Sequence, residues 1–366
     1  MAGHTAFIFS SEYEGRGMSP ITQAWARYGA TFRLVKALGL LGGGVEVVEP
    51  QQATEEELQT VHSATYVDYV RKMDKLGGGF LDGVETPAYP GIYRRAALSV
   101  GGSLLAARLI ARGEIDHAFN PGGGLHHAQV HRAAGFCVFN DIAMVARMLP
   151  RDLGLERVAI VDVDGHHADG TQAILYEEPI LKVSLHMYSR LFYPGTGSLD
   201  ETGAGAGAGF TVNVPLPVHT GHSAYLNAFD QVVEPLLRRM EPQFLLLQFG
   251  VDGHFRDPMV LLDLTARTYE GVADRMHRLA HEICGGKLLV FGGGGYQADD
   301  VARCWTVMLA TISGTLPERS RPQYDALFKE SPPAERVSVN ERIERMIFEL
   351  KARNFPLFWE ATAPPS

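Results

Sequence analysis

Arg157-Val-Ala-Ile-Val-Asp162-Val-Asp164-Gly-His166-His167-Ala-Asp169-Gly170 is the stretch that decides the fold, because an apolar run ends there in three carboxylates and two imidazoles. The run Val158–Val161 is short and rich in β-branched residues, which favours a strand buried on both faces of a parallel sheet. Carboxylates so close to a buried strand repel one another unless cations or hydrogen-bond donors balance them. Alternate strand residues share a face, so Asp162, Asp164 and His166 are expected to point the same way. The stretch therefore predicts a parallel strand that ends in half of a metal site.

The composition is that of an ordinary globular protein. Of the 366 residues, 46% are hydrophobic and 20% are charged. Single α/β domains reach this length, so we expect one domain over residues 1–366, with a core at about 5–316 and a helical C-terminal extension at about 317–360. The net charge of −9 argues against nucleic acid as a partner.

The cysteines and the N-terminus bear on the cellular compartment. The three cysteines, at positions 137, 284 and 304, form neither a C-x-x-C pair nor an even set, which argues against a disulfide framework and against a thiolate zinc site. The first residues lack a basic segment, and no apolar run reaches the length of a membrane-spanning helix. We therefore expect a cytoplasmic protein with no membrane partner.

Strand and helix patterns alternate along the chain, which predicts an α/β fold with a mostly parallel sheet. The strands are expected at Thr5–Phe9, Val45–Val48, Ile115–Phe119, Arg157–Asp164, Pro179–Leu185, Phe210–Leu216, Phe244–Phe249 and Lys287–Phe291. Long helices are expected from Ser19 to about Leu41 and at Ser63–Met73, Gly91–Arg112, Asp141–Met148, Ser223–Met240, Thr265–Cys284 and Val301–Ser313. Capping-box spacings predict a short helix after Thr54 and a last helix from Ser338 and Glu341 to about Lys351. The glycine-rich segment Gly203–Gly209 precedes a strand, whereas a dinucleotide loop must open a helix, so we exclude a nucleotide site there.

Ionisable residues gather where the predicted strands end. These residues are His126, His127, Asp162, Asp164, His166, Asp169, Asp252, His254 and Tyr296. Sites in open α/β sheets lie outside the carboxyl ends of the strands, so groups far apart in sequence are expected to converge there.

Asp164, His166 and Asp252 are our candidate metal ligands. Two carboxylates and one imidazole leave a coordination position open for water, which is the pattern of a catalytic zinc site. Asp252-Gly-His254 repeats the Asp-x-His pattern, so His254 is a rival ligand.

The other strand-end residues have the chemistry of proton transfer and oxyanion binding. One of His126 and His127 is placed to act as a general base, and Asp162 and Asp169 could fix the histidine tautomers. The glycine-rich tip before Tyr296 would let its hydroxyl donate to a developing oxyanion. We assign histidines 4, 62, 117, 131, 219, 222, 277 and 281 to the surface or the core, and we place Arg27 on the solvated face of the first helix.

These motifs resemble the zinc-dependent histone deacetylase family, in the same order along the chain. They are Asn120-Pro-Gly-Gly-Gly-Leu-His126-His127-Ala, Gly135-Phe136-Cys137-Val-Phe-Asn140-Asp141, Asp162 to Gly170, Tyr193-Pro-Gly-Thr-Gly197, Val251-Asp252 with Asp257-Pro258, and Gly292–Tyr296. The resemblance runs from the helix with Arg27 to about Leu316 and is strongest to the bacterial acetoin-utilisation branch, which is similar to class I enzymes.

The resemblance implies a single three-layer α/β/α domain of the arginase and deacetylase type, which hydrolyses acetyl-lysine or a related N-acyl amide. It makes Asp164, His166 and Asp252 the zinc ligands, with iron(II) as an alternative metal. It makes His127 the general base, His126 its electrostatic partner backed by Asp162 and Asp169, and Tyr296 the oxyanion donor. The implied substrate-binding residues are Glu85, Gly135, Phe136, Tyr193 and Gly294, and the implied structural potassium site uses Asp162, Asp164, Ser184 and the carbonyls of His166 and Leu185. It also moves Arg27 from the surface to an internal channel.

Three residues depart from the family pattern. Ala168 stands at a usual glycine, Glu85 at a usual aspartate and Tyr193 at a usual phenylalanine. Glu85 and Tyr193 leave open whether the substrate is an acylated lysine in a protein or a small acylated amine.

Three alternatives remain. An acetylpolyamine or other small-molecule amidohydrolase would prefer such amines over peptides. A di-manganese ureohydrolase needs more aspartate ligands than the sequence places, and a catalytically silent acyl-lysine reader would not need His126, His127 and Tyr296 together. Nothing in the sequence indicates the oligomeric state.

Overall fold

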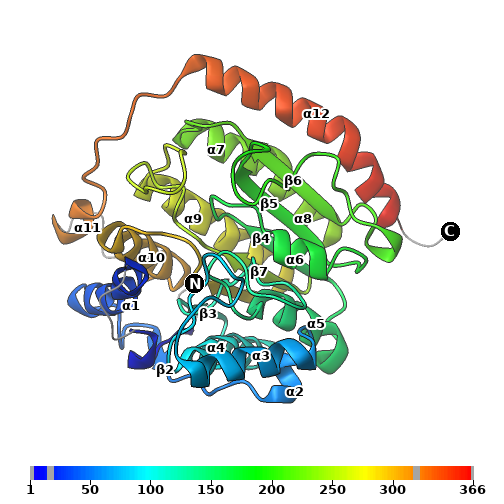
Figure 1. Cartoon of the computed structure of the whole chain (residues 1–366). Coiled ribbons are helices and arrows are strands. Elements are labelled where there is room, and N and C mark those ends of the chain that lie inside the picture. Colours follow the sequence, from blue (N-terminus) through cyan, green and yellow to red (C-terminus); the bar gives the residue numbers. More distant parts are fainter. Residues whose placement is uncertain (1–3, 15–19, 316–321, 364–366) are drawn as a thin grey trace.

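The computed structural model describes residues 4–14, 20–315 and 322–363. Its centre is an eight-stranded, wholly parallel sheet in the order β2-β1-β3-β8-β7-β4-β5-β6 (Figure 1). The strands are β1 (Thr5–Ile8), β2 (Val45–Val48), β3 (His117–Asn120), β4 (Val158–Asp162), β5 (Leu181–Met187), β6 (Thr211–Leu216), β7 (Phe244–Gln248) and β8 (Leu288–Phe291). All eight predicted strands are confirmed.

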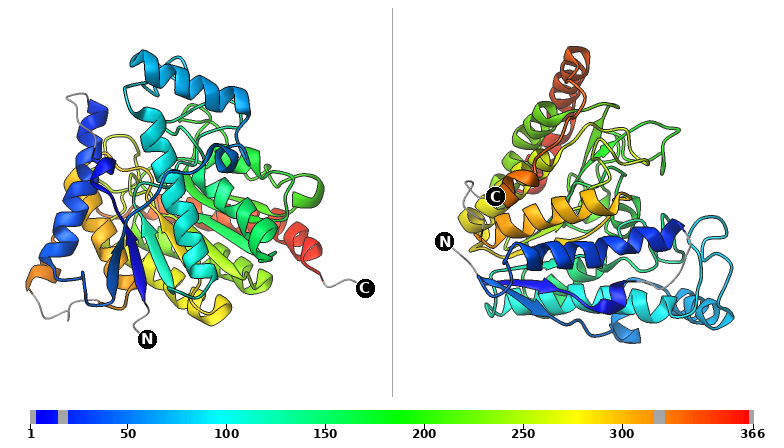
Figure 2. Two further views of the ribbon diagram at one scale, coloured as in Figure 1. Left: turned by 90° about the horizontal axis from the view of Figure 1, so that it is seen from below. Right: turned by 90° about the vertical axis from the view of Figure 1, so that its left-hand side faces the viewer.

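Both faces of the sheet are covered by helices, which makes three layers (Figure 2). Val158 and Ile160 of β4 pack into one apolar core, whereas Ala159 and Val161 pack into the other. One layer contains α2 (Glu55–Leu58), α3 (Ala64–Leu76), α4 (Ile92–Ala111), α5 (Asp141–Leu153) and α6 (Asp169–Ile174). The other contains α1 (Pro20–Ala37), α7 (His222–Ala228), α8 (Glu234–Met240), α9 (Ala266–Cys284), α10 (Ala298–Ile312) and α12 (Val337–Ala361). The uninterrupted apolar strands are explained by burial on both faces.

The C-terminal extension joins the same core. Helix α12 lies along β6 and α7 at one side of the molecule (Figure 1), and Phe358 packs edge-on against Phe210 with ring centroids 5.6 Å apart. The short helix α11 (Pro322–Ala326) precedes α12. In the described part of the chain, no helix is both long and apolar enough to cross a membrane.

Several predicted helix boundaries are wrong. The cap of α12 is Arg336, so the predicted capping box at Ser338 lies inside the helix, which also continues to Ala361. The predicted helix Ser223–Met240 is divided by a π-helical segment, Phe229–Val233. The capping box at Thr54 is confirmed, with its hydroxyl accepting from Glu57 N and the Glu57 carboxylate accepting from Thr54 N. Ser19, the predicted first residue of the first long helix, lies outside the described residues.

Candidate functional site

Strand β4 ends at Asp162, so Asp164 and His166 lie in the loop that follows it and do not continue the predicted strand face. Asp162, Asp164 and His166 are all buried. Asp162 faces His126, whereas Asp164 and His166 face Asp252 from the end of the adjacent strand β7. The loops after β3, β4, β7 and β8 thus meet at the carboxyl edge of the sheet.

Asp164, His166 and Asp252 form a compact group of possible metal ligands. Their donor atoms lie within 4.8 Å of one another, and His166 Nδ1 is 2.7 Å from Asp252 Oδ2 and 3.4 Å from Asp164 Oδ1. Burial would lower the pKa of His166, but Asp252 and Asp164 outweigh it and raise that pKa to about 10. Burial and the charge of Asp164 raise the pKa of Asp252 to about 6. Two buried carboxylates around one imidazole fit a divalent cation.

Neighbouring amides hold these carboxylates in place. Asp164 Oδ2 accepts from Gly294 N at 2.7 Å and from Gln248 Nε2 at 2.8 Å, and Asp252 Oδ1 accepts from Gly165 N at 2.6 Å. A Cβ on Gly294 would lie 2.3 Å from Asp252 Oδ2, so only glycine allows this approach. The amides leave the remaining carboxylate oxygens directed toward His166.

His126 and His127 form a buried pair with separate carboxylate partners. Their Nε2 atoms are 3.1 Å apart; His126 Nδ1 is 2.9 Å from Asp162 Oδ2, and His127 Nδ1 is 2.6 Å from Asp169 Oδ1. Burial would lower the pKa of His126, but Asp162 and Asp164 raise it to about 9. Burial and the positive charge of His126 lower the pKa of His127 to about 4. At neutral pH the pair therefore carries its proton charge on His126 and keeps His127 neutral.

A cavity of about 310 Å³ reaches this group. Its walls include His126, His127, Asp164, His166, Gly135, Phe136, Gly294 and Tyr296. Gly135 has a φ of +51°, and a Cβ there would lie 2.3 Å from the His127 ring, so a side chain at this position would displace the imidazole. Phe136 also has a positive φ of 63°. This conformation is strained for a non-glycine residue, and such strain is found most often at functional sites.

The rim loop of residues 79–88 fixes the conformation of the Phe136 turn. Gly135 N donates to Glu85 Oε1 and Phe136 N donates to Thr86 Oγ1, both at 3.2 Å. Asp82 closes the loop by accepting from the amides of Val84, Glu85 and Thr86 at 2.9–3.0 Å. Glu85 therefore contacts the cavity wall, although it does not line the cavity.

The two tyrosines occupy different places. Tyr296 lines the cavity, its amide donates to Asp257 Oδ2 at 2.7 Å, and its ring lies 6.2 Å edge-on from Phe136. Burial, followed by the charges of Asp252 and Asp164, raises the pKa of Tyr296 well above its usual value, so its hydroxyl keeps its proton. The half-exposed Tyr193 stacks edge-on to His127 at 5.0 Å but is outside the cavity lining.

The helical pattern of the sequence predicts that Arg27 faces solvent, but the structure places its side chain inside the protein. Its Nη1 donates to Gly295 O at 2.7 Å, and its guanidinium lies over the rings of Tyr28 and Trp305 at 5.1 and 5.2 Å. Arg27 also lines the cavity, with Trp25, Tyr89 and Arg95. The surface interpretation of Arg27 is therefore wrong, and the internal position implied by the resemblance agrees with the structure.

His254 lies apart from the ligand group. Its Nε2 is 2.8 Å from Glu330 Oε1, a carboxylate that also accepts from Arg303 at 3.0 Å. The rival role of His254 as a ligand beside Asp164 is therefore not supported.

Two residues of the opening stretch have structural roles. His167 faces away from the cavity, with Nδ1 2.8 Å from Thr196 Oγ1 and Nε2 3.0 Å from Gln172 Oε1. Ala168 has a φ of −74°, which any residue adopts, so alanine replaces the usual glycine without strain.

Sequence reasoning missed two supporting residues, Gln248 and Phe192, and gave Asp257 no role beyond its place in a family motif. Gln248 donates to Asp164 but was overlooked because it is the polar last residue of an otherwise apolar strand. Phe192 stacks on His166 with centroids 5.0 Å apart and planes at 13°, and Asp257 accepts from Tyr296 N. A polar residue that ends a buried strand was the available signal for Gln248.

His62 also fixes the loop between β3 and α5. Its Nδ1 is 2.9 Å from Gln129 O and must donate there, so its Nε2 accepts from Asn140 N at 2.9 Å. Burial lowers the pKa of His62 to about 4, below the value of about 6.5 in an unfolded chain. The folded protein therefore binds fewer protons, and the stability that this group contributes is complete above pH 6.5 and is lost as the pH falls toward 4.

We expect the free energy of unfolding to fall by up to about 3 kcal/mol through His62 between pH 6.5 and 4, since one pKa unit corresponds to about 1.4 kcal/mol. His62→Gln keeps a donor and an acceptor but does not titrate, so its stability should depend less on pH over this range. Urea unfolding of both chains at half-unit pH intervals measures the difference. Parallel profiles would contradict the assignment.

Comparison with known proteins agrees with this geometry. Residues 22–312 match the histone deacetylase domain model. The chain is 34% identical to acetoin utilization protein AcuC of Bacillus subtilis over 87% of this chain and 84% of that protein. It is 36% identical to a probable deacetylase of Archaeoglobus fulgidus over 81% of this chain and 82% of that protein. The crystal structure of the HDA15 HD domain superposes with a TM-score of 0.82 at 28% identity and covers 98% of this chain and 96% of that one.

The matched residues include the Asp164, His166 and Asp252 group and the His126 and His127 pair, and the superposed domain has the same overall fold. The chain therefore belongs to the histone deacetylase family.

Proposed function

We propose that the protein is a metal-dependent deacetylase that hydrolyses the amide of acetylated, or other short-chain acylated, lysine side chains or related amines. The observation that carries the proposal is the buried Asp164, His166 and Asp252 group beside the His126 and His127 pair at the cavity wall. A zinc ion, or iron(II), held by these three ligands would acidify a water molecule and polarise the amide carbonyl.

The chain's own residues would divide the proton transfers. Asp169 holds the hydrogen of His127 on Nδ1, which leaves the lone pair on Nε2. Protonated His126 donates to this lone pair across 3.1 Å, so His127 would accept a proton from the attacking water when that contact opens. His126, protonated at neutral pH beside Asp162, places a positive charge next to the developing negative charge. The Tyr296 hydroxyl would donate to the oxyanion, and its high pKa keeps the donor protonated.

A potassium ion is a further element of this proposal. Asp162 and Ser184 are paired in the register of β4 and β5, and Leu185 follows in the same strand. Asp162, Asp164 and Ser184, with the carbonyls of His166 and Leu185, would hold the ion close to the ligand group and offset its negative charge.

The first test is metal dependence. Removal of metal with a chelator should abolish hydrolysis of an acetyl-lysine peptide, and added zinc should restore it. Full activity after exhaustive chelation would contradict the proposal, and binding of acetyl-lysine without turnover by the zinc-loaded protein would indicate a reader instead.

A small acylated amine is a second candidate substrate. Tyr193 lies within the electrostatic influence of Glu85 and Asp82, so two carboxylates of the rim loop stand near the tyrosine that packs on His127. An acidic rim favours the free ammonium groups of an acetylated polyamine. The ratio of kcat/KM for acetylpolyamines to that for acetyl-lysine peptides decides between the two substrates.

Glu85→Gln should lower kcat/KM for the preferred substrate by roughly 10- to 100-fold, because a hydrogen bond to a charged group contributes about 1.5–3 kcal/mol. If the substrate is a polyamine, KM should carry most of the loss, because the carboxylate binds a remote ammonium group. The exposed Glu114, which precedes β3 at the other end of the sheet, supplies the matched control Glu114→Gln. Equal values of kcat/KM for the two variants would remove Glu85 from substrate binding.

A further inference from the structure

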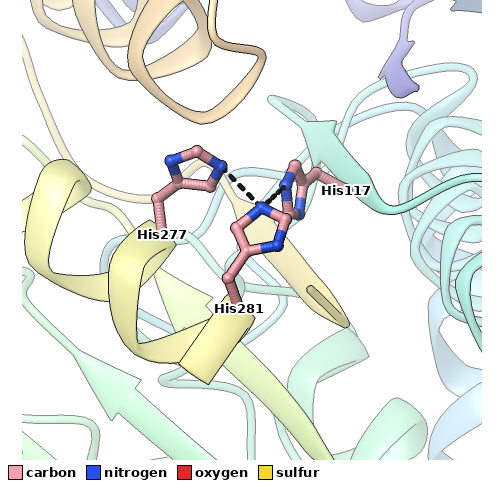
Figure 3. A group of neighbouring side chains, drawn as sticks. All are labelled: His117, His277 and His281. Atoms are coloured by element: carbon pink, nitrogen blue, oxygen red, sulfur yellow. Dashed lines mark hydrogen bonds between the residues drawn. The ribbon is translucent and has the colours of Figure 1, made fainter. Parts of the chain in front are cut away.

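Three histidines that sequence reasoning left as separate surface or core residues meet at the end of the sheet away from the catalytic group. His117 is the first residue of β3, and His277 and His281 lie one turn apart on α9 (Figure 3). The catalytic loops follow the last residues of the strands, whereas His117 stands at a strand's beginning, beside Thr5 of β1 and Leu288 of β8. The cluster is thus separate from the deacetylase site.

The three rings turn the same nitrogen toward a common point. His281 Nε2 is 3.0 Å from His277 Nε2 and 3.2 Å from His117 Nε2 (Figure 3). A tetrahedral zinc ion with Zn–N bonds of 2.0–2.1 Å separates its ligand nitrogens by about 3.3–3.4 Å. The two contacts of His281 Nε2 are within a few tenths of an ångström of that spacing, and the ligand atoms of all three rings lie within 4.8 Å of one another.

Hydrogen bonding alone does not satisfy this arrangement. The nitrogen of a neutral imidazole carries either one hydrogen or one lone pair, and His281 Nε2 contacts two other nitrogens. Only one of the two contacts can therefore be a well-formed hydrogen bond, whereas a central cation would use one lone pair from each ring.

The surroundings keep His117 and His277 in the neutral form that binds metals. Burial, with the neighbouring imidazoles, lowers the pKa of His117 to about 3 and that of His277 to about 4. Neutral imidazole is the ligand form. Asp116 and Asp274 place negative charge near His117 and His277, which favours a cation at the cluster.

A second cluster outside the catalytic site shows the contrast. His254, Asp300 and Glu330 also lie close together, but Arg256 pairs with Asp300 and Arg303 with Glu330. Two guanidinium groups already balance those carboxylates, so that cluster needs no ion. The described residues place no such cation against the three histidines.

We propose that His117, His277 and His281 form a second metal site, which binds a divalent transition-metal ion such as zinc through three Nε2 atoms and leaves one position to water. Imidazole ligands suit zinc, copper and nickel, and copper would bind more tightly than zinc at equal availability. The ion would tie α9 to the first residue of β3 and so fasten a helix to the amino ends of the central strands.

Zinc stoichiometry after equilibrium dialysis of the full chain tests the site. We expect two zinc ions per chain in the wild type, one in His281→Ala, one in Asp252→Ala and none in the double variant. Retention of both ions by His281→Ala, or loss of all zinc from Asp252→Ala, would overturn the proposal. The Asp252→Ala background also separates this site from the deacetylase metal, whatever the outcome for activity.

A matched control and a second readout distinguish ligand loss from misfolding. His222 also packs against α9, with Nδ1 3.1 Å from Thr268 Oγ1, and His222→Ala should keep two ions. His281→Ala should keep its deacetylase activity within about twofold, because the site lies at the other end of the sheet. Zinc should raise the midpoint of thermal unfolding of Asp252→Ala but not that of the double variant. An equal rise in both chains would mean that zinc binds elsewhere.

Discussion

Asp252→Ala is expected to lower kcat for acetyl-lysine hydrolysis by about a thousandfold or more. A Lewis-acid metal contributes several kcal/mol of transition-state stabilisation, and each 1.36 kcal/mol is tenfold in rate. Asp252 supplies one of three ligand groups, and its Oδ2 is 2.7 Å from His166 Nδ1. Its loss leaves Asp164 and His166 as a two-ligand site that should no longer retain zinc during dialysis.

The measurement is kcat together with bound zinc per chain, so that loss of metal and loss of activity are read in the same sample. Asp263→Ala is a matched control, because Asp263 pairs with His219 at 3.2 Å away from the cavity. Near-normal activity of Asp252→Ala at saturating zinc would show that Asp252 is not a ligand. An equal loss in Asp263→Ala would point to general destabilisation.

Supporting residues should have smaller effects than ligands. Gln248 donates to the same Asp164 oxygen as Gly294 N, so its removal leaves one donor in place. Changes of this kind reduce metal affinity by roughly 10- to 100-fold. A metal site thus predicts a much larger loss of metal affinity and activity for a change at Asp252 than for one at Gln248. A purely structural cluster predicts no such difference.

The sheet and most of the site could be predicted because both depend on local patterns. An apolar, β-branched run signals a strand buried on both faces, and parallel strands bring their carboxyl ends to one edge. Asp164, His166 and Asp252 converge for that reason alone, although 86 residues separate the last two. The resemblance to the family added the roles of Glu85, Phe136 and Tyr193, which no local pattern carries.

The rest depends on packing between elements, which spacing does not encode. Arg27 lies in an alanine-rich helix whose pattern is equally consistent with a solvated face. Its internal position was implied by the family resemblance and is seen in its contacts with Gly295 and two aromatic rings. The i, i+4 spacing of His277 and His281 predicts that they share one face of a helix. Their partner His117 is 164 residues from His281 and belongs to no motif, so the sequence does not indicate that it joins them. The start of α12 was misplaced because Ser338 and Glu341 have the spacing of a capping box. The helix in fact begins at Val337, after the cap residue Arg336, so this spacing lies inside the helix.

Tyr296→Phe is expected to lower kcat by a hundredfold or more while substrate binding changes little. Removing one donor to an oxyanion costs about 2.7–4 kcal/mol when that donor acts mainly in the transition state. The substitution keeps the ring against Phe136 and the backbone bond to Asp257, so the fold and the cavity wall should be preserved.

The control for Tyr296 is another buried tyrosine hydroxyl. Tyr269 also lies under the influence of Asp252, but its side chain belongs to the core and does not line the cavity. Tyr269→Phe should leave kcat within a few-fold, whereas Tyr296→Phe should lose kcat and kcat/KM together, the signature of an interaction made only in the transition state. A rise in KM at constant kcat would instead make Tyr296 a substrate-binding residue, and unchanged kinetics would remove it from the mechanism.

The pKa of Tyr296 is raised by burial and by the two carboxylates. The ratio of wild-type kcat to that of Tyr296→Phe should therefore stay constant across the neutral range and fall only well above pH 10.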